Sequence, residues 1–305
     1  MPQSQQSAGP VLVGIDFSES SAAVAQWVRR YFAPGLELVF VHSLVTPEWP
    51  VFLSRTLSLP ESFMDNARAG ADQRLREMAL AAPDSRISTR VALGRPAEAL
   101  ADVARELHAE LIAVGKHGER GRVRGYTGST TDRLARISPV PVLTVGGQFS
   151  RVPKRILVAL TFSSITPLVV EWTRTLSDRF GANVFGIHVI GSAVLGHVLS
   201  MSEVTQGKSL TQPEIDRVFS DESDGWRKQL LDAGIPSERV RTEIAFGDVA
   251  QEVLATAGRE GADLIVMGSH ASTVRRALLG SAASAVLREA EVPVLVVVAP
   301  DDEIS

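Results

Sequence analysis

The chain has 305 residues, enough for two domains of ordinary size, and carries 31 Lys and Arg against 35 Asp and Glu. The absence of cysteine excludes disulfides, thiolate chemistry and cysteine-based metal sites, and the net charge of −4 argues against nucleic acid as a partner. The longest apolar run, Val292–Ala299, is too short to span a membrane, and the opening segment lacks the pattern of a signal peptide. We therefore expect a soluble, cytoplasmic protein with no nucleic-acid or membrane partner.

The first half of the chain alternates short apolar runs with segments of helical periodicity. Strands are expected at Val11–Ile15, Leu36–His42, Ser88–Leu93, Leu111–Val114 and Val140–Val145. Helices are expected after Ser18 or Ser20 as the N-cap, over Asp65–Ala81, from Pro96 as the first residue, and over Ser129–Ile137. Because short apolar runs suit strands that are buried on both faces, the pattern predicts a doubly wound α/β fold with a parallel sheet.

The second half of the chain restates the first in register. Val11–Ser18 resembles Ile156–Ser163, and the closing runs of the two halves, VPVLTV and VPVLVVV, also match. Each copy spans about half of the chain, which suits a domain rather than a solenoid repeat. We therefore expect one domain over residues 1–148 and a second over residues 149–305, with a linker at residues 146–154.

Two matched pairs of side chains have structural interpretations. Trp27 and Trp172 stand among apolar residues at helical spacing, so we expect both in the core. His42 and His188 stand at matched strand ends. Packing or a backbone hydrogen bond is the more ordinary role for a histidine there, and we favour it over ligand binding.

A loop rich in glycine follows the fourth strand of the first copy. It reads Gly115-Lys116-His117-Gly118, then nine residues, then Gly128-Ser129-Thr130-Thr131 at the start of a helix. Glycines let the backbone approach a ligand closely, and the free N–H groups of a helix N-terminus attract anions. In doubly wound sheets ligands bind beyond the carboxyl ends of the strands, which is where this loop lies. Four cations add to the pattern: Lys116, Arg120, Arg122 and Arg124.

This glycine spacing after a strand, with VGIDFS before it and VPVLTV after it, resembles the universal stress protein family and its tandem two-domain members. The resemblance covers nearly the whole chain. It implies two Rossmann-like α/β domains, each with five parallel strands in the order 3-2-1-4-5. In the nucleotide-binding branch of the family it implies ATP, with the adenine near the first strand and the phosphates at the glycine loop; whether Mg²⁺ accompanies the ATP stays open.

The resemblance also assigns the site residues of the first domain. Asp16 takes the place of an acidic residue on the adenine or ribose side, and Gly14, Ile15 and Val41 line the base pocket. The residues around the ribose and phosphates are Val114, Gly115, His117, Gly118, Gly128, Ser129, Thr130 and Thr131.

Plainer roles remain open for several of these residues. Asp16 could hold a turn or cap the following helix, and the arginines of the loop could simply be solvated. His117 lies inside the glycine loop, so a structural role and a ligand role are about equally supported. No catalytic residue and no resident metal ligand is assigned.

The fifth strands suggest how the two copies associate. In dimers of the family these strands pair along an edge, so the resemblance implies that Val140–Val145 pairs with Val292–Val298 within one chain. A homodimer of the whole chain is left open.

The second copy departs from the pattern at its ligand loops. Thr161 stands in the place of Asp16, Ala271 stands in the place of Gly118, and only eight residues, Ser272–Leu279, precede the next glycine. A methyl group and a shorter loop would crowd the phosphates, so we expect nucleotide in the first domain and weak or no binding in the second.

These observations support a nucleotide-dependent stress-response or regulatory protein that binds ATP. Two alternatives stay open: a slow ATP hydrolase, and an interaction scaffold without ligand. Neither a Walker A lysine motif nor a cluster of catalytic side chains stands beside the glycine loop, so we do not expect a dedicated enzyme.

Overall fold

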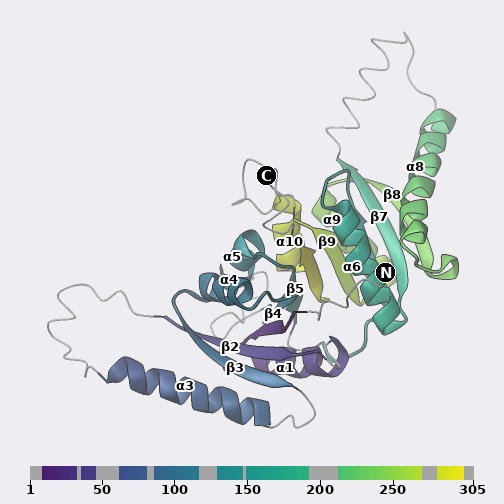
Figure 1. The fold of residues 1–305 in the computed structure, drawn as a ribbon. Helices are drawn as coiled ribbons and strands as arrows, with labels where there is room; N and C mark the ends of the chain where they lie inside the picture. Colours follow the sequence, from purple (N-terminus) through teal and green to yellow (C-terminus); the bar gives the residue numbers. More distant parts are fainter. Residues whose placement is uncertain are drawn as a thin grey trace, which may run out of the picture. The chain divides into compact units, whose positions relative to one another are not determined.

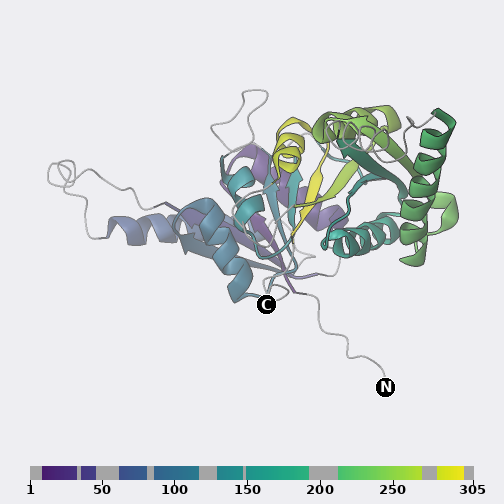
Figure 2. The same cartoon turned by 90° about the horizontal axis from the view of Figure 1, so that it is seen from above.

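A computed structural model describes residues 9–32, 36–45, 62–80, 86–116, 129–146, 149–191, 212–269 and 280–298. The chain divides into two compact units, Met1–Ser150 and Arg151–Ser305. Each unit is an α/β layer structure built on parallel strands (Figures 1 and 2). No helix in the described ranges is long and apolar enough to cross a bilayer. A cytoplasmic location stays a prediction from the sequence.

The first unit holds five parallel strands in the order β3-β2-β1-β4-β5. They are β1 Val11–Gly14, β2 Leu38–Leu44, β3 Ile87–Leu93, β4 Leu111–Gly115 and β5 Val142–Val145. The helices are α1 Glu19–Trp27, which continues into a π-helical turn at Val28–Phe32, α3 Phe63–Leu80, α4 Pro96–Glu106 and α5 Ser129–Ile137. Figure 1 shows α4 and α5 on one face of this sheet and α1 and α3 on the other.

Local signals explain where these helices begin. Ser18 is the N-cap of α1, since its side chain accepts a hydrogen bond from the Ser21 backbone N–H. Pro96 stands in the first turn of α4, where its missing N–H leaves no helical bond unmade. The faces of α4 and β4 then meet in one buried cluster that includes Leu12, Leu100 and Ile112.

The second unit repeats the order as β8-β7-β6-β9-β10. Its strands are β6 Arg155–Leu160, β7 Asn183–Gly191, β8 Val240–Gly247, β9 Leu264–Gly268 and β10 Val294–Val297. Its helices are α6 Thr166–Phe180, α8 Gln212–Asp232, a 3-10 turn at Ser237–Arg239, α9 Val249–Glu260 and α10 Ser281–Glu289. In both views α9 and α10 lie next to each other (Figures 1 and 2).

The predicted strand order and the parallel sheet are confirmed within each unit. The central strands are buried on both faces, as their apolar sequences indicate. The pairing of Val140–Val145 with Val292–Val298 stays a prediction.

One of the two tryptophan predictions was wrong. Trp27 is 3% exposed and lies in the core, but Trp172 is partly exposed. The buried stripe of α6 runs through Val169, Thr173 and Leu176, and a residue at position 172 falls on the edge of that stripe. Helical spacing alone did not separate the centre of the stripe from its edge.

Candidate functional site

The carboxyl ends of β2, β1 and β4 bring five of the predicted site residues together. Gly14 lies opposite Val41 in the register of β1 and β2, and the Ile15 N–H donates to the Val41 carbonyl at 2.8 Å. On the other side of β1, Val114 and Gly115 end β4. The strand order reverses between β1 and β4, and this switch point is where doubly wound sheets bind ligands.

The apolar residues predicted for the base pocket are covered by the protein itself. The exposed fractions are 3% for Ile15, 1% for Val41 and 5% for Val114. Gly14 is closely packed, because a Cβ there would lie 3.0 Å from Val114 Cγ1 and 3.1 Å from Leu100 Cδ1 and would require these side chains to shift. These four residues therefore form the floor beneath the strand ends.

Asp16 lies just past this floor and is exposed. Its Oδ1 accepts hydrogen bonds from the Ser18 backbone N–H at 3.0 Å and from the Ser18 hydroxyl at 2.6 Å. The Ser18 Oγ accepts from the Ser21 N–H at 3.2 Å and so caps α1. The turn-holding role left open for Asp16 is thus present, and it places a carboxylate at the carboxyl end of β1.

The matched histidines bond to the backbone, as predicted. His42 Nδ1 lies 2.7 Å from the Ile15 carbonyl oxygen, and His188 Nδ1 lies 2.8 Å from that of Leu160. Because a carbonyl oxygen only accepts, Nδ1 carries the proton in both rings. Each histidine therefore fixes the end of the first strand of its unit to the second strand.

Phe17 and Arg74 belong to this site and were missed from the sequence. Phe17 has a φ of +64°, a left-handed conformation that costs a residue with a Cβ about 1–2 kcal/mol. Its ring lies 4.4 Å from the His42 ring between centroids, and the Arg74 guanidinium carbon lies 3.9 Å from the Phe17 centroid. Arg74 in α3 thus places a cation next to the turn that carries Asp16. Phe162 stands at the matching position of the second copy, and this match was the sequence signal available for Phe17.

The first turn of α5 is anchored to the same strand ends. Thr131 is 3% exposed, and its hydroxyl donates to the Gly115 carbonyl at 3.3 Å. That hydroxyl is therefore already used as a donor, whereas the Thr130 residue is partly exposed. The backbone of Ser129 begins the helix. The amides of this first turn are the described groups suited to an anion.

An ion pair fixes α5 to α4. Arg133 Nε donates to Glu98 Oε1. Burial raises the pKa of Glu98, but a backbone hydrogen bond and the Arg133 guanidinium together outweigh burial, so the pKa lies below its usual value. Arg133 thus links α5 to Glu98 in α4.

Three predicted ligand residues, His117, Gly118 and Gly128, lie outside the described residues, as do the arginines of the loop. Among the residues that the structure describes, no group of three or more His, Asp or Glu side chains is placed to hold a metal ion.

The matching strand ends of the second unit carry different chemistry. Thr161 stands in the place of Asp16, so this position carries no carboxylate. The Thr161 hydroxyl pairs instead with the Ser163 hydroxyl at 3.0 Å. Phe162 is 72% exposed, and the buried Trp226 ring lies 4.8 Å from it and 5.3 Å from the His188 ring. An aromatic cluster thus replaces the pair of Arg74 and Phe17. Ala271 and Ser272–Leu279 lie outside the described ranges.

Comparisons with known proteins agree over both halves. The sequence profile of the Universal stress protein family matches residues 8–146 and 153–298. Universal stress protein Rv2005c of Mycobacterium tuberculosis is 24% identical over 301 residues, covering 94% of this chain and 96% of the relative. A universal stress protein of Mycolicibacterium smegmatis is 26% identical over 306 residues. A solved universal stress protein from Archaeoglobus fulgidus is 22% identical, with a TM-score of 0.65 over 96% of this chain and 97% of that chain.

Proposed function

The chain belongs to the universal stress protein family, and on that premise we propose that its first unit binds one adenine nucleotide, ATP, and transmits this occupancy to a partner protein in a stress response. The observation that carries the proposal is the convergence of Gly14, Val41 and Val114–Gly115 at the switch point, next to the first turn of α5.

Each part of this site has a chemical role toward a nucleotide. The Asp16 carboxylate is a strong acceptor for a ribose hydroxyl or an adenine amino group. The first-turn amides of α5 and the dipole of that helix favour phosphate. Arg74, next to the Asp16 turn, adds a positive charge that a nucleotide can use. These residues fit an anionic ligand with hydroxyl groups.

We propose further that the second unit binds nucleotide weakly or not at all. Thr161 cannot supply a carboxylate, and its hydroxyl is engaged with Ser163. The replacement of Gly118 by Ala271 in the matching loop adds a methyl group where a backbone would have to approach phosphate closely.

One observation favours a second candidate, the ligand-free scaffold. Ile15, Val41 and Val114 are at most 5% exposed, so a base would reach them only after neighbouring groups move. A protein that purifies without nucleotide and does not bind ATP, ADP or AMP would support this candidate over nucleotide binding.

Titration calorimetry with ATP, ADP and AMP tests the proposal. We expect one site per chain in the wild type and loss of binding in Gly118→Val, whose side chain would block close approach of phosphate. Ala271→Val, at the matching position of the second unit, is the control and should leave affinity unchanged. Equal loss in both variants, or no loss in Gly118→Val, contradicts the proposed site.

A second pair of variants separates charge from turn geometry. Asp16→Asn keeps an acceptor for the Ser18 N–H but removes the negative charge, and we expect it to weaken binding without unfolding the turn. Phosphate release measured alongside binding distinguishes the slow hydrolase, since release that exceeds a buffer control and disappears in Asp16→Asn would support hydrolysis.

A further inference from the structure

Aromatic rings gather where the strands of the second unit end. Phe162 follows β6, His188 lies in the last part of β7, and Trp226 belongs to α8. The Phe162 ring centroid lies 4.8 Å from that of Trp226 and 5.0 Å from that of His188. Trp226 is 2% exposed and His188 is 9% exposed, whereas Phe162 is 72% exposed. The cluster therefore has a buried inner layer and one ring that faces solvent, at the end of the sheet where doubly wound folds bind ligands.

A second ring pair extends the cluster along α8 and β8. The Phe219 and Phe246 rings lie 4.4 Å apart between centroids, and both residues are partly exposed. Phe219 and Trp226 are seven residues apart, which is about two helical turns, so both lie on one face of α8. That helix packs on β8 (Figure 1). We call Phe162, His188, Phe219, Trp226 and Phe246 the aromatic wall.

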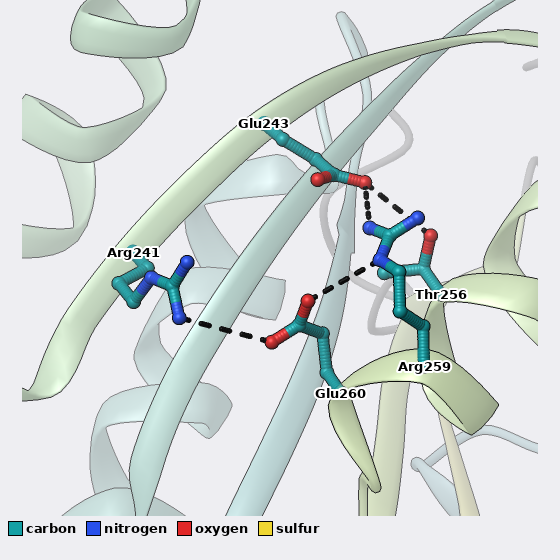
Figure 3. Close-up of polar contacts among 5 residues, drawn as sticks. All are labelled: Arg241, Glu243, Thr256, Arg259 and Glu260. Carbon is teal, nitrogen blue, oxygen red and sulfur yellow. Dashed lines mark hydrogen bonds and ion pairs between the residues drawn. The ribbon is translucent and has the colours of Figure 1, made fainter.

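The strand face beside the aromatic wall is uncharged. Side chains alternate between the two faces of a strand, and Thr242 faces α8 because its hydroxyl donates to the Ser223 carbonyl at 3.0 Å. Phe246, four residues further on, points to the same side. Arg241 and Glu243 point to the other side, where each forms an ion pair with α9 (Figure 3). The charges of β8 are thus used on the face away from the wall.

Trp226 gives the aromatic wall an unused hydrogen-bond donor. Its Nε1 atom is buried and has no hydrogen-bond partner among the described residues. An indole N–H only donates, and a buried donor without an acceptor is unfavourable. The neighbouring Phe162 side chain is mostly in solvent already, so it can turn outward at the loss of its ring contacts alone. An acceptor carried by a ligand would then satisfy the Trp226 N–H.

We propose that the aromatic wall binds an uncharged, planar aromatic molecule with a hydrogen-bond acceptor on its edge, such as a carbonyl oxygen. Phe162 turns outward to admit the ring and stacks on it, and the acceptor bonds to Trp226 Nε1. Asp221 and Asp224, which are exposed on α8, disfavour an anion here. This site goes beyond nucleotide binding in the first unit and does not depend on it.

The two units therefore differ in the charge of the ligand that they select. In the first unit a cation, Arg74, lies over the Phe17 ring, next to the proposed nucleotide site. In the second unit the Trp226 ring takes that place beside Phe162. The first arrangement suits an anion and the second suits a neutral ring.

Equilibrium dialysis of the full chain with 2-acetylnaphthalene tests the proposal. The comparison probes are 2-ethylnaphthalene, which lacks the carbonyl acceptor, and 2-naphthoate, which adds a negative charge. We expect one 2-acetylnaphthalene per chain, bound roughly threefold to tenfold more tightly than 2-ethylnaphthalene, with 2-naphthoate bound least tightly. Equal affinity for the ketone and the hydrocarbon, or tightest binding of 2-naphthoate, overturns the proposal.

Three variants assign the binding to the aromatic wall. Trp226→Phe keeps a ring but removes the N–H, so the ketone should lose its advantage while the affinity for 2-ethylnaphthalene stays the same, which also shows that the site is folded. Phe162→Ala should weaken the binding of both probes roughly threefold to tenfold. Phe17→Ala, at the matching position of the first unit, is the control and should change neither affinity. A ketone advantage that persists in Trp226→Phe, or equal losses in Phe162→Ala and Phe17→Ala, contradicts the assignment.

Dialysis in saturating ATP separates this site from the proposed nucleotide site. We expect the binding of 2-acetylnaphthalene to be unchanged by ATP, because the two ligands occupy different units. Displacement of the probe by ATP would overturn the site in the second unit and leave the nucleotide proposal standing. A chain that binds the probe through Phe162 but binds no ATP would have the opposite meaning.

Discussion

Replacing Phe17 tests whether its positive φ is a real strain held in place by its neighbours. Alanine at position 17 keeps the left-handed backbone conformation and removes the ring, whereas glycine removes the ring and the strain together. At most sites alanine is the more stabilising of the two residues. At this position we expect the opposite order, with Phe17→Gly more stable than Phe17→Ala.

The contacts of Phe17 set the magnitude. The ring pair with His42 contributes about 0.5–1.5 kcal/mol and the contact with Arg74 about 0.5–1 kcal/mol. Both variants lose these contributions, so Phe17→Ala should cost about 1–2.5 kcal/mol. Glycine recovers about 1–2 kcal/mol of strain and loses about 0.5–1 kcal/mol through chain entropy. The free energy of unfolding of Phe17→Gly should therefore be roughly 1 kcal/mol higher than that of Phe17→Ala.

Thermal unfolding followed by circular dichroism measures this order. A difference of about 1 kcal/mol corresponds to roughly 2–4 °C in Tm for a unit of this size. Phe162 is the matched control, since in the described part of the chain only Phe17 and His108 among residues other than glycine have a positive φ. The Tm of Phe162→Ala should equal or exceed that of Phe162→Gly. If the Tm of Phe17→Ala also exceeds that of Phe17→Gly, the backbone of Phe17 is not strained as proposed.

Two further predictions concern packing and charge. Gly268→Ala should lower the free energy of unfolding by about 1–3 kcal/mol, because its Cβ would lie 2.8 Å from Ile165 Cγ2. Gly258→Ala, whose Cβ would meet nothing within 4 Å, should raise the free energy of unfolding by up to about 1 kcal/mol. Chemical denaturation compares the two variants, and similar effects of both would contradict the packing explanation. Glu98→Gln should reduce stability at pH 7 by about 0.2–1 kcal/mol. The folded pKa of Glu98 lies below its usual value, so the ionised pair stabilises the fold at pH values above the unfolded pKa. The difference in stability from the wild type should vanish as the pH falls through the folded pKa, and a difference that persists at low pH would rule out the charge explanation.

The parts of the fold that follow from local patterns could be predicted from the sequence. Short apolar runs marked the strands, and Pro96 and Ser18 marked helix starts, because these signals depend on a few adjacent residues. The internal match placed His42 and His188 at equivalent strand ends, which made a shared backbone contact a reasonable expectation.

The parts that depend on distant contacts could not be predicted in the same way. The left-handed conformation of Phe17 leaves no trace in its residue type, which is unfavourable there. Arg74 reaches Phe17 only because α3 packs against β2 and β3. The ion pair of Arg90 in β3 with Glu106 in α4 has opposite signs in the second unit, where β8 carries Glu243 and α9 carries Arg259. This reversal becomes visible only when strand register aligns the two units.

We propose that one chain binds one adenine nucleotide, in its first unit. Native mass spectrometry of the intact chain in excess ATP counts the bound nucleotides, with Gly118→Val and Ala271→Val measured in parallel. We predict one bound nucleotide for the wild type and for Ala271→Val, and none for Gly118→Val. Two nucleotides per chain, or none on the wild type, would contradict the account.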